Sequence, residues 1–514
     1  MLDRSQDAIR PVGSSAKFNT SRHSLGLYRC VVNTAQYTTS PPIDKQASIS
    51  NVIENALATV MMQHGILRVG IADEDTHEPV FTYLRTINLR QMIEWKKISA
   101  SEPDAYMRDL LRSTEAQHDK LWEDLPGRPG WKLIVYQSAG PDDAENAKID
   151  ISFAFHHAYA DGQSAVIFHR DLLRALNRGG LPPAELQDHV LHLSERPRLP
   201  PGAEELVPFS ISWPYLLKRI WAEIIRKELV PSWLKPAPSP DTVPWTGNPI
   251  NPEPHKANLR LVRVPQAALA SLLTACREHG TTLTPLLQVL VLASLASRLQ
   301  PEAAPAFEFT TAISLRRFAN GSDGLFDRAD GLHCLITAHA HRVEGPAVSV
   351  LRARRGTADR TPTPQDAEST IWGAAAEIGT GLRARVNSLP RDDVAGLTAW
   401  VSDWRRRWVG RFGQRRETAW ECSNAGSLGS GDAGEGDTPG EGRWRIERNL
   451  FSQGATPVGA AFALNVAGVV GRGLWMTVSW QETAVETQLM EGLVGDLQGW
   501  VDSVGGTGRF GVFD

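Results

Sequence analysis

The sequence predicts an α/β (α+β) protein built from two lobes, each a mixed β-sheet flanked by helices, and three observations support this fold class. The chain has 514 residues, which is more than one hydrophobic core normally serves. Both halves alternate segments that have the period of strands with segments that have the period of helices. A proline-rich stretch separates the halves, so we expect an N-terminal lobe over 1–205, a crossover over 206–256 and a C-terminal lobe over 257–514.

The N-terminal half is expected to begin with a strand and to continue with helices and further strands. Helices are predicted where apolar residues recur every three or four positions, at 48–64, 103–122 and 164–177. Strands are predicted where β-branched, aromatic and apolar residues concentrate, at 23–37, 67–72, 80–84, 131–137 and 148–155. The turn-rich segment SAGPDDAENA separates the last two strands, which should therefore form a hairpin.

The proline-rich crossover contains one amphipathic segment, at 213–229. Its apolar residues, including Trp213, Leu217 and Trp221, fall on one helical face, and Lys218 falls on the other. Two alternatives follow. The helix covers an apolar surface of the protein itself, or it lies on a membrane that holds lipophilic substrates, as a peripheral contact.

The C-terminal half repeats the mixture of strands and helices. Strands are predicted at 258–264, 307–315, 333–342, 460–466 and 474–480. Helices are predicted at 266–278, 284–299 and 484–501. Residues 356–368 and 425–442 lack hydrophobic content and are expected to be mobile loops.

Composition excludes several classes of protein. Lys and Arg total 54 against 58 Asp and Glu, a formal charge of -4, so a nucleic-acid partner is not expected. The four cysteines are far apart and form no CxxC pair or dense disulfide pattern, which fits a reducing compartment. The N-terminus lacks the apolar core of a signal peptide, and no apolar run reaches the roughly 18 residues that span a bilayer. We expect a cytoplasmic monomer, either free or peripheral to an intracellular membrane.

The motif HHAYADG carries the chemistry, because it joins the strand at 148–155 to the helix that follows. It places His156, His157, Asp161 and Gly162 on a strand-to-helix turn, which projects side chains into a cleft. A histidine can take a proton from an alcohol and return it to a departing thiolate, the two proton transfers that acyl transfer from a thioester needs. Gly162 would let another group approach closely.

Asp161 needs a cationic partner if it is buried, and Arg22 and Arg316 are the candidates because each flanks a predicted strand. Two other interpretations of the histidines remain. Both could be structural, one packed and one exposed. Metal binding by His156, His157 and Asp161 is disfavoured, because adjacent histidines at a strand end point in opposite directions and no zinc-type cluster is present.

Other catalytic signatures are missing from the sequence. GxSxG does not occur, and there is no Walker A loop and no HExxH helix. Hydrolase and phosphoryl-transfer functions are therefore disfavoured.

The motif HHAYADG resembles the HHxxxDG active-site motif of the chloramphenicol acetyltransferase-like superfamily, which includes condensation domains, BAHD acyltransferases and fungal alcohol acetyltransferases. Four further segments are similar to the fungal group: SRHSLGLYRCVVNTAQY, TTAISLRRF, ECSNAGSL and the tail from FSQGATPVG onward. The BAHD motif DFGWG is absent, and so are carrier-protein and adenylation regions. The resemblance is thus strongest to the fungal alcohol acetyltransferases.

The resemblance implies two chloramphenicol acetyltransferase-like lobes with a tunnel between them. It implies that His157 is the base, that His156 is structural, and that Asp161 and Gly162 shape the loop. Arg22 is implied to pair with the motif aspartate. In the SNxG strand, where Gly426 also matches, Ser423 and Asn424 are implied to face the tunnel, where a hydroxyl or amide could donate a hydrogen bond to the oxyanion of the tetrahedral intermediate.

The expected activity is CoA-dependent O-acyl transfer, with acetyl-CoA or another acyl-CoA as cosubstrate, to the hydroxyl of a small lipophilic metabolite of secondary metabolism. No permanently bound cofactor and no metal are expected, and no CoA-binding residue is assigned. Two alternatives stay open. One is a condensation-like cyclase or a carrier-protein-dependent acyltransferase, and the other is a non-catalytic binding protein on the same scaffold.

Overall fold

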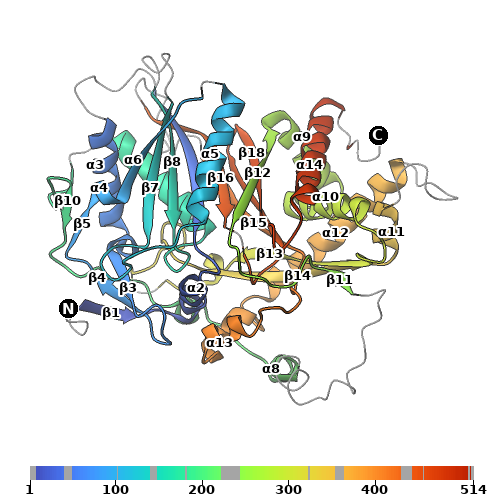
Figure 1. The fold of residues 1–514 in the computed structure, drawn as a ribbon, viewed down its shortest axis with the longest axis horizontal. Coiled ribbons are helices and arrows are strands. Elements are labelled where there is room, and N and C mark those ends of the chain that lie inside the picture. The colour runs from blue at the N-terminus through green and yellow to red at the C-terminus, as the bar shows by residue number, and fades with distance from the viewer. Residues whose placement is uncertain are drawn as a thin grey trace.

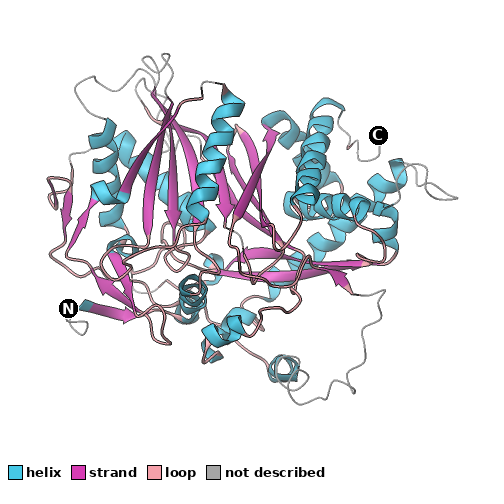
Figure 2. Cartoon of the chain, viewed as in Figure 1, coloured by secondary structure: helices cyan, strands magenta, loops and turns pink. Residues whose placement is uncertain are grey.

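The structure is a computed structural model of the chain. It describes residues 7–39, 49–100, 102–138, 147–179, 182–221, 243–321, 324–352, 364–429, 443–454, 456–507 and 510. Two lobes of strands and helices lie side by side, which confirms the predicted α/β fold class (Figure 1, Figure 2).

The first lobe is built on a five-stranded sheet with the order β16-β2-β8-β7-β6. Its strands are β2 (Val31–Thr39), β6 (Ile93–Ile98), β7 (Trp131–Ser138), β8 (Ala147–Phe155) and β16 (Arg445–Gln453). Strands β7 and β8 pair antiparallel, which confirms the predicted hairpin. Helices α3 (Ile49–Gln63) and α6 (Gly162–Arg178) pack into the hydrophobic core of this lobe, and α5 (Pro103–His118) lies between the sheet and β12 of the second lobe (Figure 1).

Two small sheets border the first lobe. One has the order β1-β4-β3 and consists of β1 (Ala8–Pro11), β3 (Val69–Ala72) and β4 (Val80–Tyr83). The other has the order β5-β10-β9 and consists of β5 (Thr86–Asn88), β9 (Leu186–Gln187) and β10 (Val190–His192). The β3–β4 connection contains Glu74, which belongs to the site described below.

The second lobe is built on a seven-stranded sheet with the order β11-β13-β15-β17-β18-β12, in which β14 pairs with β13. Its strands are β11 (Pro244–Trp245), β12 (Ala257–Pro265), β13 (Ala306–Ser314), β14 (Ile336–Glu344), β15 (Trp420–Leu428), β17 (Phe462–Val469) and β18 (Gly473–Gln481). Its helices are α9 (Gln266–Glu278), α10 (Leu283–Arg298), α11 (Pro346–Arg352), α12 (Pro364–Ser388) and α14 (Thr487–Thr507), which share one core with the sheet.

Helix α10 is buried on all sides, and its residues are accordingly almost all apolar. Every residue from Pro285 to Ala296 is buried, as expected for a helix at the centre of a core. Within the described part of the chain, no single helix has the length and apolar character needed to cross a bilayer. Helices α9 and α10 meet that test only as a pair bent by 99°.

One strand of the first sheet comes from the C-terminal half of the sequence. Strand β16 pairs antiparallel with β2 over almost its whole length, and β17, the next strand in the chain, returns to the second sheet. The sheet of the first lobe is therefore completed by a strand from the C-terminal half of the chain.

Several sequence predictions need correction. The first strand, predicted at 23–37, begins only at Val31, because α2 (Ser14–Ser24) and a turn with Gly26 at φ +72° occupy the preceding residues. Residues 425–428, predicted as loop, belong to β15, and α12 begins at Pro364 within the predicted loop 356–368. Residues 430–442 and 353–363 lie outside the described residues. Strands β6 and β16 and helices α2 and α12 were not predicted.

The amphipathic segment of the crossover forms α8 (Trp213–Ile220), and residues 222–229 of the predicted helix lie outside the described residues. No residue of α8 is buried. Tyr215, Leu216 and Ile220 are half-buried, whereas Trp213 and Leu217 are exposed, so the helix rests on the protein with one side and exposes the other.

Candidate active site

The HHAYADG segment forms the turn between β8, which ends at Phe155, and α6, which begins at Gly162. Asp161 is the N-cap of α6, where its Oδ1 accepts a hydrogen bond from the Ser164 N–H at 2.7 Å. This is the ordinary way in which an aspartate satisfies a free N–H at the start of a helix. A Cβ on Gly162 would lie 3.0 Å from the Phe451 ring of β16, so a larger side chain there would require a shift of that ring.

His157 is held in one tautomer by the turn itself. Its Nδ1 lies 2.8 Å from the Ala160 carbonyl oxygen, which can only accept, so Nδ1 carries the proton and Nε2 carries the lone pair. Nε2 has no hydrogen-bond partner among the described residues. Burial, and after it the positive charge of Arg22, lowers the pKa of His157 to about 4. The imidazole is thus neutral at physiological pH, with a lone pair available at Nε2.

The surroundings of His157 come from both halves of the sequence. The Tyr28 ring lies 5.6 Å from the imidazole, centroid to centroid. The thiol of Cys334 lies 3.7 Å from Nδ1. The Asn19 amide of α2 donates to the His157 carbonyl at 3.3 Å and contacts the Cys334 sulfur at 3.6 Å. The histidine is therefore packed from three segments.

Of the two arginines expected beside Asp161, the structure brings Arg316 to the carboxylate. Arg316 begins the short helix η6 (Arg316–Phe318) of the second lobe, and its guanidinium lies 3.2 Å from Asp161 Oδ1. The Leu335 N–H donates to Oδ2 at 3.0 Å. Burial would raise the pKa of Asp161, but Arg316 and the hydrogen bonds from Leu335 and Ser164 outweigh it and lower the pKa below its usual value.

Arg22 lies elsewhere, and the implied pair with Asp161 is not formed among the described residues. It occupies the last turn of α2, where its guanidinium covers the rings of Phe18 at 4.3 Å and Tyr28 at 4.5 Å and donates to Asn19 Oδ1 at 2.6 Å. Because residues 14–24 form a helix and not a strand, this arginine faces the aromatic side of the site. It acts there as a fixed positive charge near His157.

His156 forms a hydrogen-bonded triad with Glu74 and His23. Glu74 Oε1 lies 2.8 Å from His156 Nε2, and the Glu74 carboxylate lies 2.9 Å from His23 Nδ1. Burial would raise the pKa of Glu74, but its hydrogen bonds to the two imidazoles outweigh burial and lower that pKa to about 2. Sequence analysis missed Glu74, because nothing distinguishes it from its acidic neighbours in the turn after β3.

The triad has the residue types of a metal site, and its ligand atoms lie within 4.8 Å of one another. Its hydrogen bonds, however, indicate that the two imidazoles donate to the Glu74 carboxylate and do not bind a metal ion. His156 Nδ1 accepts the Ala158 N–H at 2.9 Å, and His23 Nε2 accepts the Trp122 N–H at 3.1 Å. The nitrogens facing Glu74 therefore carry the protons and donate them to the carboxylate, so neither has a lone pair for a metal ion.

Asn424 and Ser423 have different environments in β15. The Asn424 amide donates to Thr284 Oγ1 at 3.1 Å, and its Oδ1 accepts the Gly426 N–H at 2.9 Å. Gly426 has φ +86°, and the pairing of β15 with β17 shifts register between Asn424 and Ser427. The Asn424 side chain thus supports an irregularity in the strand and is already hydrogen-bonded.

Ser423 lies on the opposite face of β15, together with Glu421, because successive side chains alternate. Cys422 lies on the other face, in the core of the second lobe. Burial raises the pKa of Glu421, against the opposing effects of Arg22 and of a hydrogen bond to Gln453. Glu421 and Ser423 therefore belong to the face of β15 that looks toward the first lobe, and sequence analysis missed Glu421.

A chain of buried polar side chains joins Tyr28 to the second lobe. The Tyr28 hydroxyl donates to Gln453 of β16 at 2.8 Å, and the Gln453 amide donates to Asn465 of β17 at 2.8 Å. Asn465 in turn donates to Thr477 of β18 at 3.3 Å. The position of the ring beside His157 is thereby tied to three strands.

The site thus presents a neutral histidine at a strand-to-helix turn, held by contacts from both lobes of a two-lobed fold, and the comparisons define the class of this protein as an acyltransferase. Residues 12–319, more than half of the chain, match the family model described as alcohol acetyltransferase. The chain belongs to the alcohol acetyltransferase family, which confirms the resemblance found in the sequence.

Two fungal relatives are similar over nearly the whole chain. A probable alcohol acetyltransferase, FCK4 of Fusarium pseudograminearum, is 30% identical over 510 residues, which are 98% of this chain and 97% of the relative. A probable alcohol acetyltransferase, crmB of Aspergillus fumigatus, is 25% identical over 93% of this chain and 96% of the relative.

Two solved structures share the fold. The trichothecene 15-O-acetyltransferase TRI3 of Fusarium sporotrichioides matches with a TM-score of 0.67 and 13% identity over 95% of each chain. The condensation domain of the monacolin K polyketide synthase MokA matches with a TM-score of 0.56 and 13% identity over 98% of this chain and 99% of that one. The fold is thus common to acetyltransferases and condensation domains.

Proposed function

We propose that this enzyme transfers an acyl group, in the first instance acetyl, from a CoA thioester to the hydroxyl of a small lipophilic metabolite, with His157 as the general base. The observation that carries the proposal is the hydrogen bond from His157 Nδ1–H to the Ala160 carbonyl, because it leaves the lone pair on Nε2. The names of the fungal relatives support an alcohol as acceptor.

The proposed reaction needs no covalent enzyme intermediate. Nε2 of His157 takes the proton of the alcohol as its oxygen attacks the thioester carbonyl. The tetrahedral intermediate then expels the thiolate by breaking the C–S bond, and the imidazolium returns the proton to sulfur. The products are the ester and free CoA, and the histidine is neutral again.

The surrounding residues have supporting roles in this proposal. Asp161 and Arg316 hold the turn on which His157 stands, and Gly162 permits the contact with β16. Ser423 is our candidate donor to the oxyanion, since its hydroxyl lies on the face of β15 that looks toward the first lobe. Asn424 is not a candidate donor, because its side-chain amide is already hydrogen-bonded to Thr284 and Gly426.

We further propose that acetyl-CoA is a cosubstrate and not a resident cofactor. We also propose that the enzyme acts as a monomer in a reducing compartment. Because acetyl-CoA is made inside the cell, we take this compartment to be the cytoplasm. All four cysteines are free and buried, which suits such a compartment. The proposed lobes remain 1–205 and 257–514, joined by a crossover at 206–256, with β16 inserted from the second into the first.

The test is release of CoA from acetyl-CoA in the presence of a panel of alcohols, followed with a thiol reagent and by mass spectrometry of the ester. His157→Ala should lower kcat/KM by about 10²–10⁴-fold with unchanged folding. A matched control is His77→Ala, since the His77 side chain is 64% exposed. Near-normal turnover in the His157 variant would refute the proposal.

Condensation domains share this fold, so the same assay is run with an acetylated carrier protein as donor. Acyl transfer from the carrier protein without any release of free CoA from acetyl-CoA would favour the carrier-dependent or cyclising alternative. Absence of transfer from either donor, with tight binding of the alcohol, would favour a binding protein.

A further inference from the structure

Helix α8 presents an apolar face to solvent. Trp213 is 76% exposed, Leu217 61% and Trp221, which follows the last residue of the helix, 55%. Their spacing of four residues places them on one side of the helix. Large apolar residues exposed together in this way mark an interaction surface. Figure 1 shows α8 at the lower edge of the molecule, away from both sheets.

The start of α8 is fixed to the body of the protein. Ser212 caps the helix, and it also donates to the Asp392 carboxylate through its N–H at 2.6 Å and its hydroxyl at 2.9 Å. Asp392 comes just before the short helix η7 (Val394–Trp400), in which Trp400 is 63% exposed. The apolar face of α8 thus has a defined anchor and an exposed tryptophan on the neighbouring element.

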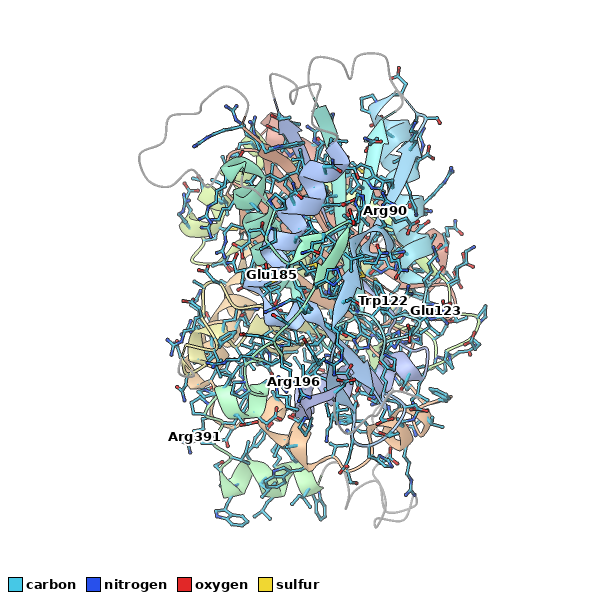
Figure 3. All side chains as sticks on the ribbon, turned by 90° about the vertical axis from the view of Figure 1, so that its left-hand side faces the viewer. Arg90, Trp122, Glu123, Glu185, Arg196 and Arg391 are labelled. Atoms are coloured by element: carbon cyan, nitrogen blue, oxygen red, sulfur yellow. The ribbon has the colours of Figure 1, made fainter. Side chains whose placement is uncertain are left out.

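Helix α13 (Trp404–Val409) lies at the same end of the molecule. Figure 1 places α13 and α8 at the same edge, and Figure 3 shows Arg391, just before η7, at that end of the molecule as well. Val409 is 49% exposed and Phe412, which follows α13, is 37% exposed. We call the exposed residues of α8, η7 and α13 the lower face.

The charge of the lower face is positive where it borders the apolar side chains. Helix α8 contains Lys218 and Arg219 and no acidic residue, and α13 has the sequence WRRRWV, in which Arg406 is exposed. The Arg391 side chain is 70% exposed and lies 3.5 Å from the Asp392 carboxylate, so the positive charge of this face comes mainly from the helices. Tryptophans beside basic residues suit the boundary between anionic lipid headgroups and acyl chains.

We propose that the lower face binds the surface of an anionic membrane, with Trp213, Leu217 and Trp221 inserted at the headgroup boundary. A protein partner would bury the basic side chains together with the apolar ones, whereas a lipid surface accommodates both at once. The helix is too short to span a bilayer, so the contact is peripheral. This inference does not depend on the reaction assigned to His157.

The test is flotation of the full chain with vesicles of phosphatidylcholine alone and of an equimolar mixture of phosphatidylcholine and phosphatidylserine. The wild type should float with the mixed vesicles. The variant W213S/L217S/W221S should lose on the order of tenfold or more in bound fraction. A control variant, L121S/V470S, removes exposed apolar residues elsewhere, which are 46% and 60% exposed, and should bind like the wild type.

Two further measurements make the outcome decisive. K218Q/R406Q should weaken binding to the anionic vesicles, and added salt should weaken it as well. The same melting temperature and the same turnover of a soluble alcohol should be found in all variants. Equal flotation of the triple variant and the wild type, or no flotation with either vesicle, would overturn the proposal. So would a dimer in solution that the triple variant abolishes, since a second copy would then cover the face.

Discussion

Arg316 of the second lobe lies 3.2 Å from Asp161 of the first, and both side chains are almost completely buried. This ion pair crosses the junction between the lobes and fixes the turn that carries His157. The same guanidinium also donates to Ser164 Oγ at 2.7 Å and to the His333 carbonyl at 3.1 Å. One arginine thus joins the start of α6 to the loop segment that leads into β14.

Removing this arginine should destabilise the whole protein. Arg316→Ala leaves Asp161 buried and unpaired, for which we expect a loss of about 3–5 kcal/mol in the free energy of unfolding. Thermal and urea denaturation measure it. Arg317→Ala is the matched control because Arg317 is exposed and should have almost no effect. Wild-type stability in the Arg316 variant would show that the pair contributes little.

The activity should resist acid more than an ordinary histidine would allow. Burial, with a smaller effect of Arg22, lowers the pKa of His157 to about 4, so the base stays neutral as the pH falls through the usual range near 6.5. The kcat/KM should stay level from neutral pH down to about pH 5 and decline below it, within the range where circular dichroism reports an intact fold. A decline centred near pH 6.5 would contradict the assignment.

The variant Arg22→Gln tests whether the charge of Arg22 contributes to the lowered pKa of His157. Removing the positive charge should raise the pKa of His157, so the acid limb of the pH–rate profile should move to higher pH. Lys17→Gln removes a cation from the same helix as a control and should leave the profile in place. An unchanged profile in the Arg22 variant would mean that burial alone sets the pKa.

Glu74 should position His156 by hydrogen bonding and not through a metal ion. Glu74→Gln removes the negative charge to which both imidazoles donate and replaces one acceptor oxygen by an NH2 donor, so we expect a loss of about 1.5–3 kcal/mol in stability and a lower kcat with little change in KM. Glu78→Gln, at an exposed position of the same turn, is the control. A chelator should leave the activity of the wild type unchanged, and loss of activity that zinc restores would contradict the tautomers assigned here.

The same carboxylate gives a pH signature in stability. The pKa of Glu74 is lowered to about 2 from an ordinary value of 4.5. The folded state therefore gains stability from this group above pH 4.5 and loses it as the pH falls toward 2. The acid limb of the unfolding free energy should be shallower in Glu74→Gln than in the wild type, and equal limbs would argue against the shift.

Substitutions at Ser423 and Asn424 should affect different properties, the first mainly kcat and the second mainly the melting temperature. Ser423→Ala should lower kcat, by as much as about 10²-fold if its hydroxyl stabilises the oxyanion, with an unchanged melting temperature. Asn424→Ala should lower the melting temperature, because it frees the Gly426 N–H and the Thr284 hydroxyl, and should affect kcat less. A large loss of kcat in Asn424→Ala together with a lower melting temperature in Ser423→Ala would show that Asn424 is the oxyanion donor and Ser423 the structural residue.

The sequence predicted local structure well where the pattern of one segment decides it. Helix α9 was predicted with the bounds found, because its helical period runs unbroken from a proline to Glu278. The turn with HHAYADG was placed between β8 and α6 because both flanking patterns are strong. Strand β16 was missed because RIERNLFSQ mixes polar and apolar residues without a strict period, and its pairing with β2 depends on the whole fold.

The site was predicted only where a motif carried it. His157 and Asp161 came from HHAYADG, and Arg316 was one of two candidates that chain position could not separate. Arg22 was expected on a strand edge, and its place on α2 depends on packing against Phe18 and Tyr28. Glu74 and Glu421 become recognisable only when folding brings them to their partners, since a single acidic residue gives no signal in the sequence.

The exchange of β16 limits how this protein can be divided. A gene cut at the crossover would encode a first fragment in which β2 keeps its pairing with β8 but has lost β16 on its other edge, so the backbone groups of that edge are left unpaired. It would also encode a second fragment with a surplus strand that has no sheet to join. Both fragments would tend to associate with other copies, so recombination between related genes at this junction would be selected against unless both parts were inherited together.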